Sequence, residues 1–299
     1  MGDQKVRVSQ AAAQGMKTLT LRPEPGCMVW GNVEYAKRNG KTLNLQILRP
    51  AFPDKTVPEK LPLVAFVPGS GWRKQNVYRS IPNLSRFALR GFVVGIIEYR
   101  ESDLAPFPAQ MQDCKTAVRF LRANAGQYGI DINNVALWGG SSGGHTVLFS
   151  GITGDSSFDT PDYSEYSCKV NSIVNFYGPA DLTRMADYDS TEKHASPDGA
   201  VGYLLGRLSA PENLLWAKTA SPVNYIFPEK ECPPVLTFHG NCDMTVPFEQ
   251  SIVLHEALLK AGKHSEFYKI DGAGHGSGEF WSNELLDIVE EFIRRYNIK

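Results

Sequence analysis

From residue 61 to the C-terminus, short apolar runs alternate with longer amphipathic stretches. Runs 61–67 and 91–97 have the length of buried strands, whereas residues 107–125 space their apolar side chains along one helical face, with Gly126 and Gly129 as stop signals. Such alternation is typical of a parallel sheet covered by helices. The sequence therefore predicts an α/β fold with a mostly parallel central sheet of about eight strands.

Two segments depart from this alternation. Residues 28–36 and 41–48 alternate apolar with polar side chains around an Asn39-Gly40 turn, which predicts an antiparallel hairpin leading into the sheet. Residues 178–227 are polar and irregular, and a stretch this long between two strands is more often an inserted cap than a structureless loop. We expect one domain over residues 1–299, with the cap at about 178–227.

Composition excludes several functional classes. The 31 basic and 32 acidic residues leave a formal net charge of -1, which argues against nucleic acid or an anionic membrane as partner. No apolar run approaches the roughly 18 residues of a membrane span, and the first 20 residues lack the apolar core of a leader. The five cysteines show no CxxC spacing, which favours reduced thiols in the cytoplasm over disulfides or zinc.

Residues 139–144 read Gly-Gly-Ser-Ser-Gly-Gly, between an apolar strand and an apolar helix. In this context G-x-S-x-G forms a nucleophile elbow, a strained turn in which small flanking residues expose the serine hydroxyl. Ser141 and Ser142 both satisfy the pattern, and we choose Ser141 because the glycine pair then follows on the helix side. A phosphate-binding loop is the alternative, but no lysine follows and G-x-G-x-x-G is absent.

A serine hydroxyl needs a base, held by a third group, to become a nucleophile. Asp243 follows the apolar strand PPVLTF, residues 233–238, and His275 lies in a glycine loop after the last strand, 265–270. The chain order Ser141, Asp243, His275 is the one that a hydrolase of this topology requires. We therefore predict that these three residues form a catalytic triad.

The loop after strand 61–67 reads Gly69-Ser70-Gly71-Trp72. Its small residues would let backbone N–H groups approach a substrate oxygen that becomes negative during the reaction. We predict an oxyanion hole formed by the N–H groups of Gly71 and Ser142, with Ser70 as a third candidate donor. A simple tight turn is the alternative interpretation. Trp72 is the candidate substrate contact.

Together these motifs resemble those of α/β-hydrolase esterases, close to the bacterial carbohydrate acetyl/feruloyl esterase-like group related to prolyl oligopeptidases. The resemblance covers roughly residues 60–295 and rests on VPGSGW, VALWGGSSGGH, NFYGPADL, PPVLTFHGNCDMTVP and GAGHG. It implies an α/β-hydrolase fold with Ser141 as nucleophile, Asp243 as acid and His275 as base. The chain departs from the group at residues 68–72, where related esterases often carry His-Gly-Gly-Gly-Trp.

We accordingly predict a serine hydrolase acting on a small-molecule carboxylic ester with a small acyl group, such as acetyl on a carbohydrate. The mechanism needs neither a metal nor an organic cofactor. No sequence feature specifies an oligomeric state. One alternative is an exopeptidase or amidase, because the same triad cleaves amides. Another is a catalytically silent binding protein of the same fold, against which the intact triad argues.

The remaining histidines and Cys242 have simpler interpretations. We expect His145 and His239, which adjoin strand ends, to be packed structural residues. We expect a solvated surface position for His194, His255 and His264. Cys242, beside Asp243, is expected to act as a small buried apolar residue.

Overall fold

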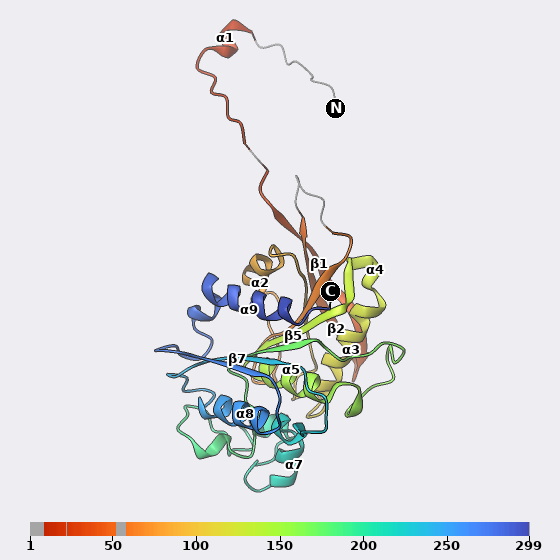
Figure 1. Cartoon of the computed structure of the whole chain (residues 1–299), viewed down its shortest axis with the longest axis vertical. Helices are drawn as coiled ribbons and strands as arrows, with labels where there is room; N and C mark the ends of the chain where they lie inside the picture. Colours follow the sequence, from red (N-terminus) through yellow and green to blue (C-terminus); the bar gives the residue numbers. More distant parts are fainter. Residues whose placement is uncertain (1–8, 22, 52–57, 299) are drawn as a thin grey trace.

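The computed structural model describes residues 9–21, 23–51 and 58–298 (Figure 1). Residues 1–8, on which the prediction about a leader partly rests, lie outside the described part. Eight strands form one sheet in the order β1-β2-β4-β3-β5-β6-β7-β8. Strand β2 pairs antiparallel with β1 and β4, and every other neighbouring pair is parallel. The strands are β1 (Gly26–Arg38), β2 (Lys41–Ala51), β3 (Leu61–Val67), β4 (Val93–Ile97), β5 (Ile130–Gly140), β6 (Ser172–Phe176), β7 (Val235–Gly240) and β8 (Ser265–Ile270).

The predicted hairpin is confirmed as β1 and β2. Asn39 and Gly40 join the strands with φ of 50° and 75°, as a two-residue hairpin turn with left-handed residues requires. The strand–helix alternation after residue 61 is also confirmed, with helices α2 (Ile81–Ala88), α3 (Ala109–Ala123), α4 (Ala125–Tyr128), α5 (Ser142–Thr153), α8 (Glu249–Lys260) and α9 (Asn283–Arg295). The short helix α1 (Gln10–Ala13) precedes the sheet and stands away from it (Figure 1).

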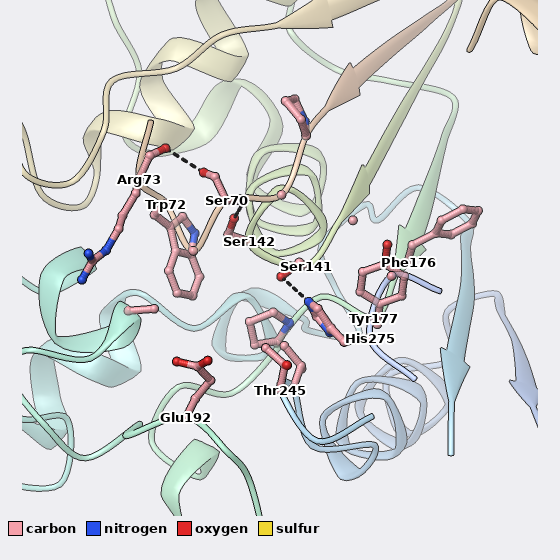
Figure 2. Close-up of a pocket in the computed structure, with 18 of the residues that line it drawn as sticks. Ser70, Trp72, Arg73, Ser141, Ser142, Phe176, Tyr177, Glu192, Thr245 and His275 are labelled. Atoms are coloured by element: carbon pink, nitrogen blue, oxygen red, sulfur yellow. Dashed lines mark hydrogen bonds between the residues drawn. The ribbon is translucent and has the colours of Figure 1, made fainter. Parts of the chain in front are cut away.

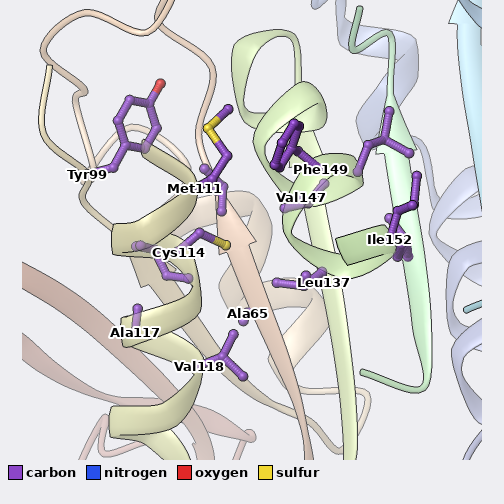
Figure 3. Packing of buried hydrophobic residues seen from close by; sticks show 14 of the residues in the cluster. Ala65, Tyr99, Met111, Cys114, Ala117, Val118, Leu137, Val147, Phe149 and Ile152 are labelled. Carbon is purple, nitrogen blue, oxygen red and sulfur yellow. The ribbon is translucent and has the colours of Figure 1, made fainter. Parts of the chain in front are cut away.

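Helices cover both faces of the sheet. On one face α3, α5 and α8 pack over the strands, and Figure 3 shows Met111 and Cys114 of α3 facing the strands that carry Ala65 and Leu137. On the other face α2 and α9 bury a second cluster around Trp138. This arrangement, with the strand order, is the predicted α/β-hydrolase fold.

The segment 178–227 runs between β6 and β7 and contains only short elements. These are η2 (Met185–Asp187), α6 (Ala200–Leu204), α7 (Leu214–Thr219) and η3 (Pro222–Tyr225), and the chain also has η1 (Gly154–Ser156) and η4 (Gly278–Trp281). Strands β3, β5, β6, β7 and β8 are parallel, so the loops at their carboxyl ends gather at one edge of the sheet. In the described ranges, no helix has both the length and the apolarity to cross a membrane.

Candidate active site

Ser141 lies on a strained turn between β5 and α5. Its backbone has φ 56° and ψ -127°, a conformation that costs a non-glycine residue about 1–3 kcal/mol and is found mostly at functional sites. The Ser141 N–H donates to the Phe176 carbonyl at 2.9 Å and ties the turn to the neighbouring strand β6. The turn therefore presents the Ser141 hydroxyl at the carboxyl edge of the sheet.

Close backbone contacts explain the glycines on either side of Ser141. A Cβ on Gly139 would lie 2.4 Å from the Gly143 carbonyl oxygen, and one on Gly143 would lie 2.0 Å from the Val67 carbonyl oxygen. No side chain fits either position, so β3, β5 and the first turn of α5 can approach each other only with glycine there. The neighbouring Ser142 is 2% exposed, and its side chain turns into the protein.

The structure brings Ser141, Asp243 and His275 together from the loops after β5, β7 and β8. The Ser141 hydroxyl lies 2.9 Å from Nε2 of His275 (Figure 2), and Nδ1 of His275 lies 2.7 Å from Oδ2 of Asp243. His275 can therefore accept the serine proton while it donates its own Nδ1–H to the carboxylate.

Asp243 is held as a carboxylate by several donors. Its buried side chain also accepts the N–H groups of Thr245 at 2.8 Å and Val246 at 2.9 Å. Burial by itself would raise the pKa of Asp243, but hydrogen bonds from His239 and His275, with the Val246 N–H, outweigh it and hold that pKa well below its ordinary value. Asp243 is thus set to stabilise a positively charged His275.

His239 is packed as predicted, but its contact with Asp243 was not predicted. Its ring is fully buried, with Nε2 3.1 Å from the Val246 carbonyl and 3.3 Å from Oδ2 of Asp243. The Ser251 hydroxyl lies 2.7 Å from Nδ1 and can donate to it, which leaves the hydrogen on Nε2. His239 therefore donates toward the same carboxylate oxygen as His275.

Tyr177 is a second residue that sequence reasoning missed. It follows β6 with φ 40°, and its ring packs edge-on against His275 with the ring centres 4.7 Å apart. Phe280 packs on Tyr177 at 4.4 Å. The strained backbone at the end of the central strand β6 thus places the Tyr177 ring beside the His275 imidazole (Figure 2).

The predicted oxyanion loop lies beside Ser141. The Ser70 N–H already donates to Oγ of Ser142 at 2.9 Å, so this third candidate is engaged. Within the described residues the Gly71 N–H makes no hydrogen bond to protein. Ser142 is the first residue of α5, where an N–H has no partner inside the helix. Two of the three candidate N–H groups are therefore open.

The Trp72 side chain, the candidate substrate contact, is almost entirely buried. It is 2% exposed, and its indole N–H donates to Nδ1 of His145 at 3.2 Å. His145 is fully buried in α5, as predicted, and its Nε2 lies 2.8 Å from the Ala220 carbonyl. One edge of Trp72 lines the cavity, so most of its surface serves packing.

A cavity of about 920 Å³ opens at this edge of the sheet. Ser141 and His275 form its floor, and Glu192, His194 and residues 198–201 of the segment 178–227 form part of its wall. Figure 2 shows the Glu192 carboxylate directed into this space, and Arg73 also lines it. The Arg73 guanidinium lies 4.0 Å above the centre of the Tyr203 ring, so an aromatic side chain holds it at the rim of the cavity.

Two expectations about single residues are wrong. His194 is not solvated: it is 6% exposed and lines the cavity, because its Nε2 lies 3.0 Å from the Thr245 carbonyl and 3.0 Å from the Ser190 hydroxyl. Cys242 is exposed, since it lies on the turn after β7 and not in the core. His264 is exposed as expected, and His255 is half-buried against Ser265.

Metal ligation needs several His, Cys, Asp or Glu side chains to converge. Across residues 9–21, 23–51 and 58–298, no three of them come together in a way that could hold an ion. The donor groups in this site are instead arranged around a serine hydroxyl.

Comparison with known protein families gives a match over more than half of the chain. The model of the BD-FAE family matches residues 50–258. This chain belongs to the BD-FAE family. The motif resemblance is thereby confirmed at the level of the family and of the α/β-hydrolase fold.

Several relatives of this BD-FAE protein carry esterase names. The probable carboxylic ester hydrolase LipM of Mycobacterium tuberculosis is 28% identical over 239 residues, 80% of this chain and 53% of that protein. A truncated carbohydrate esterase from gut microbiota superposes with a TM-score of 0.78 at 27% identity, covering 90% of this chain and 96% of the other. A propionate-bound thermophilic esterase from Thermogutta terrifontis gives 0.71 at 28% identity, covering 92% and 97%. The chain spans about half the length of the curated relatives it matches.

Proposed function

We propose that this BD-FAE protein is a serine esterase that hydrolyses carboxylic esters with small acyl groups, such as acetyl groups on carbohydrate. The observation that carries the proposal is the hydrogen-bonded chain from Ser141 through His275 to Asp243, at the floor of a cavity of about 920 Å³. The esterase names of its relatives support the same activity.

In the first step His275 takes the proton from Ser141 while Oγ attacks the ester carbonyl carbon. The imidazole becomes positively charged, and Asp243 stabilises that charge through Nδ1–H at 2.7 Å. The carbonyl oxygen becomes negative and accepts the N–H groups of Gly71 and Ser142. Each such donor contributes about 3 kcal/mol to the transition state.

The tetrahedral intermediate then collapses, and His275 gives its proton to the departing alcohol. The acyl group stays on Ser141 until water, deprotonated by His275, attacks it and releases the acid. All proton transfers use one imidazole, so the cycle is complete with groups of this chain.

The polar side chains that line the cavity are suited to binding an alcohol with several hydroxyl groups. Glu192 can accept hydrogen bonds from hydroxyls and Arg73 can donate to them, while Asn76 and Asn83 add further polar groups to the lining. We infer that the segment 178–227 acts as a cap that holds the alcohol portion. Each of the five cysteines is free, which supports a reducing location such as the cytoplasm.

The first experiment tests the nucleophile. Ser141→Ala is expected to lower kcat on p-nitrophenyl acetate by at least about 10³-fold, because the attacking group is lost. The matched control, Ser157→Ala, changes a serine outside the cavity and should keep wild-type turnover. Circular dichroism checks that both variants fold. Substantial turnover by folded Ser141→Ala would refute the assignment.

The second experiment addresses the substrate. The wild-type protein is offered acetylated xylo-oligosaccharides, p-nitrophenyl esters with acyl chains of two to eight carbons, feruloyl esters and aminoacyl anilides. We expect the highest kcat/KM on short acyl esters of carbohydrate. Preference for anilides would identify an amidase or exopeptidase, and failure to react with a fluorophosphonate probe would identify a silent binding protein.

A further inference from the structure

The loop that carries Gly71 has no regular secondary structure, yet the residues on both sides of Gly71 are fixed. The Ser70 N–H before it donates to Oγ of Ser142 at 2.9 Å. After it, the Trp72 carbonyl accepts the Ser102 N–H at 2.8 Å. Gly71 and Trp72 have φ of 62° and 56°. Glycine adopts this left-handed conformation readily, but Trp72 is held in one that a non-glycine residue rarely adopts.

The Trp72 side chain supplies a third anchor. Its indole N–H donates to Nδ1 of His145 at 3.2 Å, and the two rings meet edge-on with centres 5.0 Å apart. His145 lies one helical turn after Ser142 in α5, so the first turn of this helix holds the loop at two points. The bond between Trp72 and His145 is buried and therefore excludes competing water, whereas the bond between Ser70 and Ser142 is part-buried.

The hydrogen-bond partners of His145 fix its tautomer. An indole N–H can only donate, so Nδ1 must carry a lone pair, and a carbonyl can only accept, so Nε2 must carry the hydrogen that is shared with Ala220. Only the neutral ring satisfies both partners. Ala220 belongs to the segment between α7 and η3, so one imidazole joins the oxyanion loop, the elbow helix and the segment 178–227.

We propose that His145 is a positioning residue for ester hydrolysis: by holding Trp72 it keeps the Gly71 N–H aimed at the oxyanion, and through Ala220 it fixes this loop to the segment that walls the cavity. The inference rests on the proposed function. Its consequence is that loss of the His145–Trp72 bond weakens transition-state stabilisation more than substrate binding.

The test uses His145→Phe, which keeps an aromatic ring but no acceptor, and Trp72→Phe, which removes the donor. Each variant is expected to lower kcat on p-nitrophenyl acetate about 10- to 100-fold with KM within about twofold, because an oxyanion donor is misplaced. The kcat of the double variant should be no lower than that of the less active single variant, because both substitutions break the same hydrogen bond. His145→Gln, whose amide offers both an acceptor and a donor, should recover part of the loss.

A trifluoromethyl ketone separates positioning from mere stability. It forms a tetrahedral adduct with the serine and places an oxyanion in the hole, so its inhibition constant should rise in parallel with the loss of kcat. His255→Phe, a half-buried histidine on α8, is the control and should keep wild-type kcat. If His145→Phe does not fold, Trp72→Phe decides the matter alone.

Folded variants that keep kcat and the ketone inhibition constant within about twofold of wild type would overturn the inference, even if their melting temperatures fall. That outcome leaves the proposed function intact, because wild-type turnover and its loss in Ser141→Ala are measured separately. A wild-type protein without turnover and without fluorophosphonate labelling would instead refute the proposed function.

Discussion

A buried neutral imidazole makes the stability of this protein depend on pH. Burial lowers the pKa of His145 from 6.5 to about 4, and the hydrogen bond to the Ala220 carbonyl only partly offsets this effect. The unfolded chain therefore binds a proton near pH 6.5 that the folded chain does not bind until about pH 4. His145 contributes its full share of stability above pH 6.5 and loses it as the pH falls toward 4.

The magnitude follows from the two pKa values. The difference of about 2.5 between 6.5 and about 4, at about 1.4 kcal/mol per pH unit, gives about 3 kcal/mol. This is a large part of the roughly 5–15 kcal/mol by which proteins are stable. His145→Phe removes the titrating group, so the gap in unfolding free energy between wild type and variant should narrow by about 3 kcal/mol from pH 7.5 to pH 4.

Urea unfolding followed by circular dichroism at pH 7.5, 6, 5 and 4 measures this gap. Other titrating groups, including the buried His194, are present in both proteins and cancel in the difference. Trp72→Phe is the control, because it removes the same hydrogen bond but keeps the imidazole and should retain the acid sensitivity of the wild type. A gap between wild type and His145→Phe that stays constant with pH would refute the reasoning.

Two further predictions concern the loop and the cavity. Ser142→Ala removes the acceptor of the Ser70 N–H and should lower kcat on p-nitrophenyl acetate about 10-fold at nearly constant KM, measured by steady-state kinetics; unchanged kcat would contradict this role. Glu192→Gln should lower kcat/KM about 10-fold on acetylated xylo-oligosaccharides but leave p-nitrophenyl acetate unaffected, because only the sugar offers hydroxyls. The exposed Glu231→Gln is its control, and an equal loss on both substrates would argue against recognition of the alcohol.

The strands and the hairpin were predictable because their signals are local. Alternation of side chains and the Asn39-Gly40 turn are read within a few residues, and β1 and β2 follow them. Helix ends were less predictable. Gly126 lies inside α4 and does not end a helix. Gly129, with φ 64°, caps the C-terminus of α4. A glycine ends a helix only where the backbone takes up the left-handed conformation, and neighbouring packing decides where that happens.

The meeting of Ser141, Asp243 and His275 was predictable for a geometric reason. Each follows a parallel strand of one sheet, so the chain has little freedom to place them elsewhere. The positions of His194 and Tyr177 were not predictable in this way. His194 is buried through a contact with Thr245, 51 residues further along the chain, and the packing of Tyr177 on His275 needs β6 and β8 to be placed first.

The choice between Ser141 and Ser142 shows how one local pattern supports two different side-chain positions. Both serines have glycines two residues away, and neither second glycine could carry a Cβ: one on Gly143 would lie 2.0 Å from the Val67 carbonyl oxygen, and one on Gly144 would lie 2.5 Å from Oδ1 of Asn175. The two side chains differ in their partners: Oγ of Ser141 lies 2.9 Å from Nε2 of His275, whereas Oγ of Ser142 accepts the Ser70 N–H. The two hydroxyls are therefore not interchangeable: in the proposed function Ser141 attacks the ester, and Ser142 holds the loop whose Gly71 N–H receives the resulting negative charge.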